Sequence, residues 1–358
     1  MVPMLNWKGN IGALLQPLIA VFIGLLGGAI AIVLIGGSIS DTYAQMWKGA
    51  FGNFYFLTNT LTRATSLILV GLGVSIAFRA GFFNMGSEGQ MILGALTSAM
   101  IALYFPGPPV FKLFAALLGG IAVGGIWSAF AGWLDARFKM NLIVTTLLFN
   151  YIAALFAGYL VAYPLKDKTG SAALAQTMMV DKSIWLPKLF QGMSMHAGFI
   201  IAIVFAVLLF LFIKYSAAGY EIRMLGYNPL FAAYGGVNRG KLMLASMFAS
   251  GGFAGLAGAV EVLGMQYRYT DGMITNPGFA WSGIMATLLS GAHPLGTTVA
   301  AVLLAALQTG GMGVERNTSI PLEISSVIQS LLILFVTAKF SYTLWKRRKG
   351  GGSGAASS

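Results

Sequence analysis

Long apolar stretches separated by short polar segments dominate the chain, and this pattern predicts helices that cross a membrane. Six uncharged stretches are each long enough to hold the roughly 20 apolar residues of a transmembrane helix. They lie between Lys8 and Asp41, Lys112 and Asp135, Lys139 and Lys166, Lys188 and Lys214, Lys241 and Glu261, and Asp271 and Glu315. Several membrane-spanning helices are therefore expected.

The apolar runs between charge clusters predict an all-α integral membrane protein with about ten transmembrane helices. The expected helices cover residues 17–37, 62–79, 88–105, 109–134, 141–163, 197–214, 241–264, 279–291, 295–310 and 320–343. The first apolar segment is as long as a span, so we expect a retained helix and not a cleaved signal peptide. An interrupted or re-entrant segment is expected near residues 80–90, where glycine and polar residues break the pattern.

Lysine and arginine positions predict the orientation, because short cytoplasmic loops of membrane proteins are enriched in these residues. With both termini in the cytoplasm, the inner loops hold Arg79, the pair Arg137 and Lys139, and residues 214–241. The long loop at 164–196 then lies outside. Residues 41–62 are rich in aromatic side chains and are expected to lie at the outer membrane interface without crossing it.

The domain organisation follows from the same pattern. Residues 1–343 are expected to form a single transmembrane domain. Residues 344–358 begin with a basic cluster, Lys346–Lys349, expected at the cytoplasmic surface, and end in "GGGSGAASS". A Gly/Ser composition of this kind is typical of a flexible linker.

Composition narrows the class of protein further. The 358 residues are 57% hydrophobic and 9% charged, whereas soluble domains carry about 25% charged residues. The net charge of +12 is spread along the membrane boundaries, which favours contact with lipid headgroups and gives no indication of nucleic-acid binding. There is no cysteine, and the two histidines, His196 and His293, cannot form a metal site alone.

The stretch "RAGFFNMGSEGQMILGAL" (79–96) holds the most unusual polar residues of the chain. Non-helical backbone survives at membrane depth only where protein or a water-filled cavity covers it. Glu88 would cost about 2.5–3.5 kcal/mol at the centre of a lone helix, which favours a pathway or a partner. The residues alone leave a second interpretation open, in which this stretch is a cytoplasmic turn and the Glu88 carboxylate is stabilised by the dipole at the N-terminus of the next helix.

A family resemblance bears on that choice. The segment "GLGVSIAFRAGFFNMGSEGQMILGAL" resembles the "GFxNxGxEGQ" signature of permeases from ABC importers, in the branch that includes ribose, branched-chain amino-acid and, most similar, nucleoside-type permeases. "TTLLFNYIAALFAGYLV", "SGGFAGLAGAVEVLG" and "GIMATLLSGAHPLG" resemble further segments of that branch. The resemblance covers residues from about Gly71 to Gly296, which is most of the transmembrane chain.

The resemblance implies a solute pathway along the interrupted segment and two later helices. Its expected residues are Phe82, Asn84, Glu88, Gln90, Asn150, Tyr151 and Trp281. Aromatic faces suit a nucleobase, and amides suit its edges and the ribose. Two departures from the family pattern, Leu142 after Asn141 and Trp281 within "GFAWSG", bear on which solute is carried.

The loop "GYEIRMLGYNPLFAAYGGVNRGK" resembles the cytoplasmic loop that docks on the ATPase in this branch. The residues themselves predict a short helix over 229–234, with Asn228 as N-cap, Pro229 in the first turn and Gly235 after the end. The resemblance assigns ATPase coupling to Gly219, Glu221, Arg223, Asn228, Pro229 and Phe231.

The chain has no phosphate-binding loop of the Walker type, so ATP and Mg²⁺ are expected on a separate cytoplasmic ABC ATPase. The chain itself is then no enzyme and carries no cofactor or metal. The resemblance also implies a second permease subunit in a heterodimer, an external solute-binding lipoprotein and a bacterial inner-membrane location. A nucleoside is the expected solute. A ribose-type sugar or other small-solute permease, an ion-coupled secondary transporter and, as a weaker option, a membrane-embedded enzyme stay open as alternatives.

Overall fold

The computed structural model describes residues 26–318, with gaps at 31, 35 and 170–173, together with residues 327 and 330. Among these residues, six helices are long and apolar enough to cross a membrane, or seven if the bent pair Leu26–Leu34 and Ile39–Phe51 is one span. The expected helix at 320–343 lies outside the described residues except for Val327 and Ser330, as do the tail and the start of the helix at 17–37.

The helices follow the predicted order with shifted ends. They are α2 (Ile39–Phe51), α3 (Phe54–Arg79), α4 (Ser87–Tyr104), α5 (Pro109–Phe138), α6 (Leu142–Ala162), α7 (Gly198–Tyr215), α8 (Ala217–Tyr227), α9 (Pro229–Tyr234), α10 (Arg239–Glu261), α11 (Phe279–Leu289) and α12 (Pro294–Asn317). Helix α10 continues into a π-helical turn, η2 (Val262–Gln266). Helix α11 has 11 residues and is too short to cross a bilayer alone.

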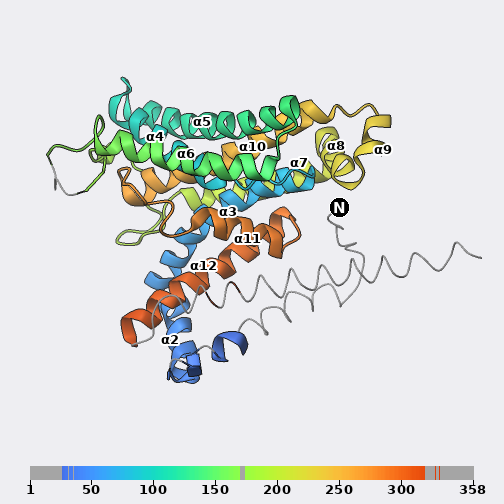
Figure 1. Ribbon diagram of the computed structural model, residues 1–358. Helices are drawn as coiled ribbons and strands as arrows, with labels where there is room; N and C mark the ends of the chain where they lie inside the picture. Colours follow the sequence, from blue (N-terminus) through green and yellow to red (C-terminus); the bar gives the residue numbers. More distant parts are fainter. Residues whose placement is uncertain are drawn as a thin grey trace, which may run out of the picture. The chain divides into compact units, whose positions relative to one another are not determined.

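The chain divides into two compact units, each described separately. The larger unit comprises residues 57–305, in which α4, α5 and α10 pack together and α6 packs on α4 (Figure 1). Glycines bring α5 and α10 close, since a Cβ at Gly255 would overlap the carbonyl oxygen of Gly120. Small residues at such positions allow helices to approach each other closely.

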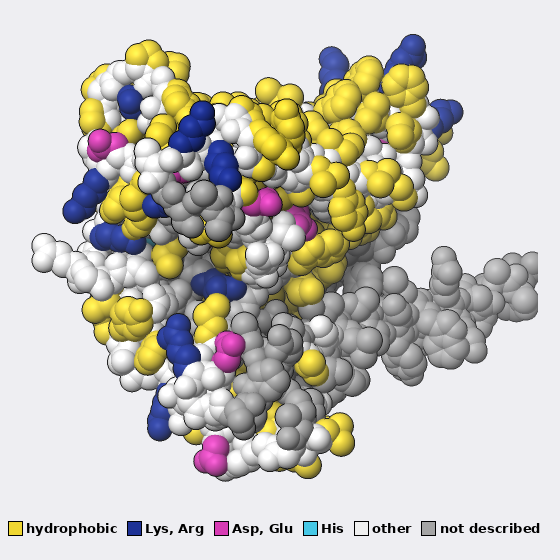
Figure 2. Space-filling view, turned by 60° about the vertical axis from the view of Figure 1, so that its left-hand side comes forward, with side chains coloured by type: hydrophobic (Ala, Val, Ile, Leu, Met, Phe, Trp, Pro, Cys, Tyr) yellow, Lys and Arg dark blue, Asp and Glu magenta, His cyan; other side chains and the backbone are white. Residues whose placement is uncertain are grey.

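The central helix and the outer helices differ in how much of their surface is exposed. Helix α3 is buried along most of its length, whereas α5, α6 and α7 each leave a broad apolar side exposed. Figure 2 shows broad areas of hydrophobic side chains on the surface with few Asp and Glu among them. Exposed apolar faces of this width are what lipid contact requires.

A folded loop closes the end of the larger unit opposite α8 and α9. It includes a 3₁₀ turn, η1 (Lys182–Ile184), and the backbone N–H groups of Val180 and Leu186 donate to the carbonyls of Tyr267 and Leu263. His196 is buried here, and burial together with nearby Lys188 lowers the pKa of its imidazole to about 4. His196 is therefore neutral at physiological pH.

The smaller unit contains α2 and the last turns of α12. Ser38 caps α2, and a Cβ at Gly49 would overlap Gly313 of α12. Trp47 and Phe51 form a ring pair on α2, with Trp47 66% exposed. The aromatic segment expected at the interface is thus helical, and Phe54–Phe56 already belong to α3, which begins eight residues before the expected start at 62.

Candidate functional site

The break between α3 and α4 is a turn followed by extended chain. Helix α3 ends at Arg79, and the chain reverses at Gly81, which has a φ of 86°. The amide of Phe82 donates back to the carbonyl of Ala77. Such a positive φ favours glycine, which has no Cβ to clash. Residues 82–86 are non-helical, and α4 begins at Ser87.

The start of α4 lies deep in the helix bundle. Asn84 contacts Ser128 of α5 and Ser250 of α10, and the backbone amide of Gly89 contacts Asn150 of α6. At 1.5 Å per residue, Ser128 and Ser250 lie roughly 15 Å from the helix ends near α8. That distance is about half of the ~30 Å hydrocarbon core of a bilayer. The interrupted backbone therefore lies well inside the ends of the helices that surround it.

A closed hydrogen-bond network holds this backbone. Asn84 and Gln90 form a reciprocal amide pair, with Nδ2 to Oε1 and Nε2 to Oδ1 distances of 3.0 Å each. Asn84 Nδ2 also lies 2.9 Å from Ser250 Oγ and 3.3 Å from Ser128 Oγ, and its Oδ1 accepts from the amide of Gly86. Asn84 is fully buried and Gln90 is 1% exposed. Burial without such partners would be costly for each amide.

Asn150 closes the network from α6. Its Oδ1 accepts from the amide of Gly89 at 2.8 Å, and its Nδ2 donates to the carbonyl of Met85 at 2.9 Å. Close approach makes this possible, because a Cβ at Gly89 would contact the Asn150 backbone. The side chain thus replaces hydrogen bonds that a continuous helix would have supplied.

Glu88 and Trp281 stand apart from the closed network. Trp281 Nε1 of α11 donates to Glu88 Oε2 of α4 at 3.0 Å. Glu88 is half-buried and Trp281 is 41% exposed. The first turns of α4 and α11 are therefore bridged by the Glu88 carboxylate and the Trp281 indole, which are both partly exposed at the surface of the chain. A carboxylate that faces lipid inside the membrane is energetically costly.

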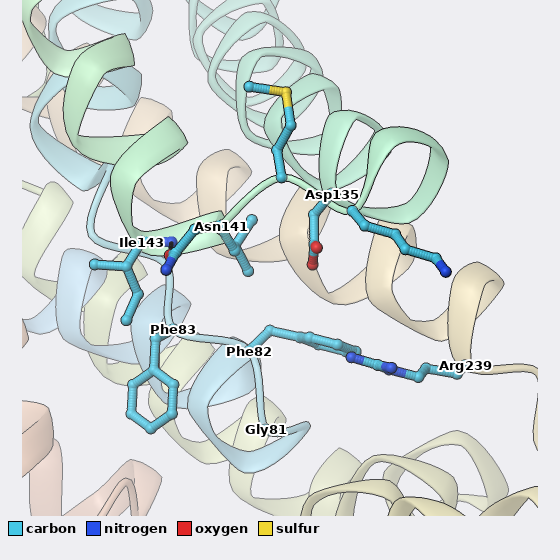
Figure 3. A pocket seen from close by; sticks show the side chains of 10 residues that line it. Gly81, Phe82, Phe83, Asp135, Asn141, Ile143 and Arg239 are labelled. Carbon is cyan, nitrogen blue, oxygen red and sulfur yellow. Dashed lines mark hydrogen bonds between the residues drawn. The ribbon is translucent and has the colours of Figure 1, made fainter.

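The remaining expected pathway residues lie elsewhere. Phe82 lines a cavity of about 420 Å³ together with Asp135, Asn141 and Arg239. The Arg239 guanidinium lies 6.0 Å from the Phe82 ring centre, and Figure 3 shows the two side chains alongside each other. This cavity is at the ends of α3, α5 and α10 near α8. Tyr151 is 70% exposed on the outer face of α6.

The loop after α7 folds as two short helices. Ser216 caps α8 by accepting from the amide of Gly219, and Asn228 caps α9 by accepting from the amides of Leu230 and Phe231. Helix α9 spans Pro229–Tyr234, which confirms the predicted boundaries. Phe231 is 60% exposed and Leu230 is 75% exposed. These two apolar side chains lie side by side in sequence on the exposed side of α9.

The expected coupling residues divide into exposed and inward-facing groups. Arg223 donates to the carbonyls of Ile213 and Lys214 at the end of α7. Gly219 is buried, and a Cβ there would overlap the backbone of α7. Glu221 is exposed. Arg223 and Gly219 thus fasten α8 to α7, while Phe231 lies at the surface.

Two polar residues near the site, Ser128 and Arg63, were not predicted as site residues from the sequence. Ser128 has no local signal, because a serine in an apolar helix is common. Glu261 is 5% exposed and accepts from Ser66 at 2.9 Å, and the Arg63 guanidinium lies 5.2 Å from the ring centre of Phe279. Charged residues within spans were a usable signal for this second buried group. Across the described residues, no three His, Asp or Glu side chains gather as a metal site.

Comparison with known proteins places these features in context. Residues 56–337 match the family model described as "Branched-chain amino acid transport system / permease component". The guanosine ABC transporter permease protein NupP of Bacillus subtilis is 35% identical over 344 residues, covering 94% of this chain and 97% of NupP. The glucose ABC transporter permease protein TsgB13 of Haloferax volcanii is 30% identical, covering 90% and 87%. The nucleoside ABC transporter permease protein NupB of Lactococcus lactis is 30% identical, covering 91% of both chains.

Proposed function

The chain belongs to the branched-chain amino acid transport permease family, and we propose that it carries a nucleoside into a bacterial cell. It is the permease component of an ABC importer, so ATP hydrolysis takes place on another subunit. The proposed substrate class draws on the guanosine and nucleoside permeases among its relatives. In the proposed orientation, both termini and α8–α9 face the cytoplasm, consistent with the distribution of Lys and Arg.

The observation that carries the proposal is the Glu88–Trp281 pair. It joins two helices that begin inside the bundle, and both side chains are partly exposed at the surface of the chain. Facing acyl chains would cost a carboxylate about 2.5–3.5 kcal/mol on insertion scales, so a water-filled route or a partner subunit is the favoured neighbour. Discontinuous helices with inward-pointing N-termini are a common basis for solute sites near the midplane.

The chemistry of this pair suits a nucleoside. The half-exposed indole of Trp281 offers a flat face for a base. Glu88 Oε1 has no hydrogen-bond partner among the described residues, so it is available to accept from a ribose hydroxyl or a base N–H. Asn84, Gln90 and Asn150 act in this proposal by fixing the backbone that presents Glu88.

Phe82 and Tyr151 take more distant places in the proposed route. Phe82 lines the cavity next to α8 and would meet the solute only on the cytoplasmic side. Tyr151 would face the route if the second permease subunit, proposed as a different chain, covers that side of α6. The solute is proposed to arrive from an extracytoplasmic binding lipoprotein.

The exposed apolar residues of α9 are proposed to dock on the cytoplasmic ATPase. Phe231 and Leu230 are held outward by a short, capped helix, and a self-contained ion-coupled carrier has no need of such a surface. The glucose permease TsgB13 supports a sugar as the second candidate substrate. A sugar has no flat aromatic ring system with N–H donors, so a sugar and a nucleoside would contact Trp281 in different ways.

Uptake by the assembled transporter tests the proposal. The chain is reconstituted in vesicles with its ATPase, second permease and binding protein, and uptake of guanosine, ribose and glucose is measured with and without ATP. ATP-dependent uptake of guanosine in clear preference to both sugars is expected. Preference for a sugar would replace the substrate class, and uptake without any ATPase would overturn the importer assignment.

A further inference from the structure

Arg79 lies where three parts of the larger unit meet. It is the last residue of α3, it directly precedes the turn into the interrupted segment, and its side chain is largely covered. Arg79 has no part in the solute pathway proposed above. Its contacts reach both the docking loop and the turn between α11 and α12.

The first contact is with α8. A Cβ at Gly226 would overlap the carbonyl oxygen of Arg79, and the backbone of Gly226 also lies against Gly81. Only glycine fits at position 226 without moving one of these backbones. The backbone of α8 is therefore in close contact with the start of the segment that leads to α4.

The second contact is with the turn after α11. Arg79 Nε donates to the carbonyl of Ala292 at 2.6 Å. Ala292 has a φ of 60°, a left-handed conformation that is uncommon for a residue with a Cβ. A charged donor on this carbonyl stabilises the turn and fixes the end of α11, the helix that carries Trp281.

A second cation lies on α8. Arg223 has the same charge as Arg79, and its guanidinium donates to the carbonyls of Ile213 and Lys214. Because the two cations repel, movement of α8 changes the electrostatic energy at Arg79 as well as its packing.

We propose that Arg79 is a positioning residue that links the docking helices α8 and α9 to both interrupted helices, α4 and α11. The inference rests on the proposed function, in which α9 docks on the ATPase. It adds that one side chain and one glycine, Arg79 and Gly226, pass that movement to the two elements that carry Glu88 and Trp281. Glu88 and Trp281 then both move in response to a single movement of α8.

A thiol reporter on α11 tests this link. The chain has no cysteine, so Leu288→Cys, at a side chain that is 41% exposed, gives a single labelling site. The labelling rate is measured in the complete transporter, nucleotide-free and trapped with ATP and vanadate. Arg79→Gln and Gly226→Ala are compared with Gly240→Ala, whose added Cβ would meet no atom closer than 3.6 Å.

If Arg79 links the helices in this way, trapping with ATP and vanadate changes the labelling rate of the Leu288→Cys protein, alone or with Gly240→Ala. When Arg79→Gln or Gly226→Ala is added, the difference in labelling rate between the two nucleotide states becomes at least about fivefold smaller, which is the lower end of typical coupling between sites. Co-purification of the ATPase is unaffected in all of them, and uptake falls in parallel with the labelling change.

Two outcomes would overturn the inference alone: an undiminished labelling change in both variants, or loss of ATPase binding in both. The second result would make Arg79 part of the docking surface instead of a link. Absence of any nucleotide-dependent change in the reporter background, with no ATPase bound, would overturn the proposed function as well.

Discussion

Two polar interruptions of this apolar chain, the stretch Asn84–Gln90 and the loop Ser216–Asn238, hold their asparagines in opposite ways. Asn228 and Asn238 each cap the helix that follows them within three residues. Asn84 instead bonds to serines 44 and 166 positions away. The asparagines of the loop bond only within the loop, whereas the asparagine of the deep break bonds both to its own Gly86 and Gln90 and to serines of two other helices.

The difference follows from the surroundings of each segment. Near α8 and α9 water can satisfy a free amide, so local caps suffice, and apolar residues such as Phe231 remain exposed. Inside the helix bundle of a membrane protein, lipid supplies no water, so every interrupted peptide group needs a protein partner or a water-filled cavity. Identical residue types thus have a local role in one region and a long-range role in the other.

The largest effect is expected from Asn84→Ala. The substitution leaves Gln90, Ser250 and the amide of Gly86 short of partners, and each buried unsatisfied group costs about 1–3 kcal/mol. The detergent-solubilised protein is expected to unfold at a clearly lower temperature, with uptake lost. Asn141→Ala, at the exposed cap of α6, is the matched control, and equal melting temperatures for the two variants would contradict the network's role.

The next largest effect is expected from Phe231→Ala. The side chain is exposed and makes little contribution to the fold, but removal of a central aromatic anchor of a docking site typically costs 2 kcal/mol or more. Uptake and ATPase co-purification are expected to fall at least about tenfold with unchanged melting temperature. Phe114→Ala, an equally exposed phenylalanine on α5, is expected to behave as wild type; normal uptake by Phe231→Ala would remove α9 as the docking site.

A smaller effect is expected at the bridge between the two interrupted helices. Trp281→Phe removes the indole donor to Glu88 while keeping an aromatic face, and a typical intramolecular hydrogen bond contributes a net stabilisation of about 0.5–1.5 kcal/mol. Transport KM is expected to rise several-fold with little change in melting temperature. In a double-mutant cycle with Glu88→Gln the two effects are expected to be non-additive; strict additivity would show that the pair does not act together.

The smallest effect is expected from Asn228→Ala. Loss of an N-cap costs about 1 kcal/mol, and it falls on α9 alone. A two- to fivefold weaker ATPase interaction is expected, measured by titration of the ATPase into the reconstituted permease. An effect as large as that of Asn84→Ala would abolish the contrast between local and long-range asparagines.

Much of the helical pattern could be predicted from the sequence, because the periodicity of apolar residues and the capping residues of a helix depend only on nearby positions in the chain. The start of α4 was expected at 88 and lies at Ser87, and α9 matches its prediction because Asn228, Pro229 and Gly235 act on adjacent residues. The start of α3 was missed by eight residues, because exposed aromatic residues at its start suit an interfacial segment and a helix equally well.

The partners of the deep amides could not be predicted in this way. Asn84, Gln90 and Asn150 were identifiable as polar residues in membrane segments, but nothing local to Ser128 or Ser250 indicates that they face Asn84. Arg223 was expected to help position the docking helix, but its partners, the carbonyls of Ile213 and Lys214, could not be predicted, since a long side chain can turn back to any free carbonyl within reach. Which atoms meet depends on how α5, α6 and α10 pack.

Labelling of Trp281→Cys by a membrane-impermeant maleimide, with and without guanosine, tests most directly whether the paired helix starts face a solute route. The thiol is expected to react from the aqueous phase in the reconstituted transporter, and guanosine delivered by the binding protein is expected to slow that reaction. Reaction with lipid-soluble maleimide alone, or a rate that guanosine leaves unchanged, would contradict the account.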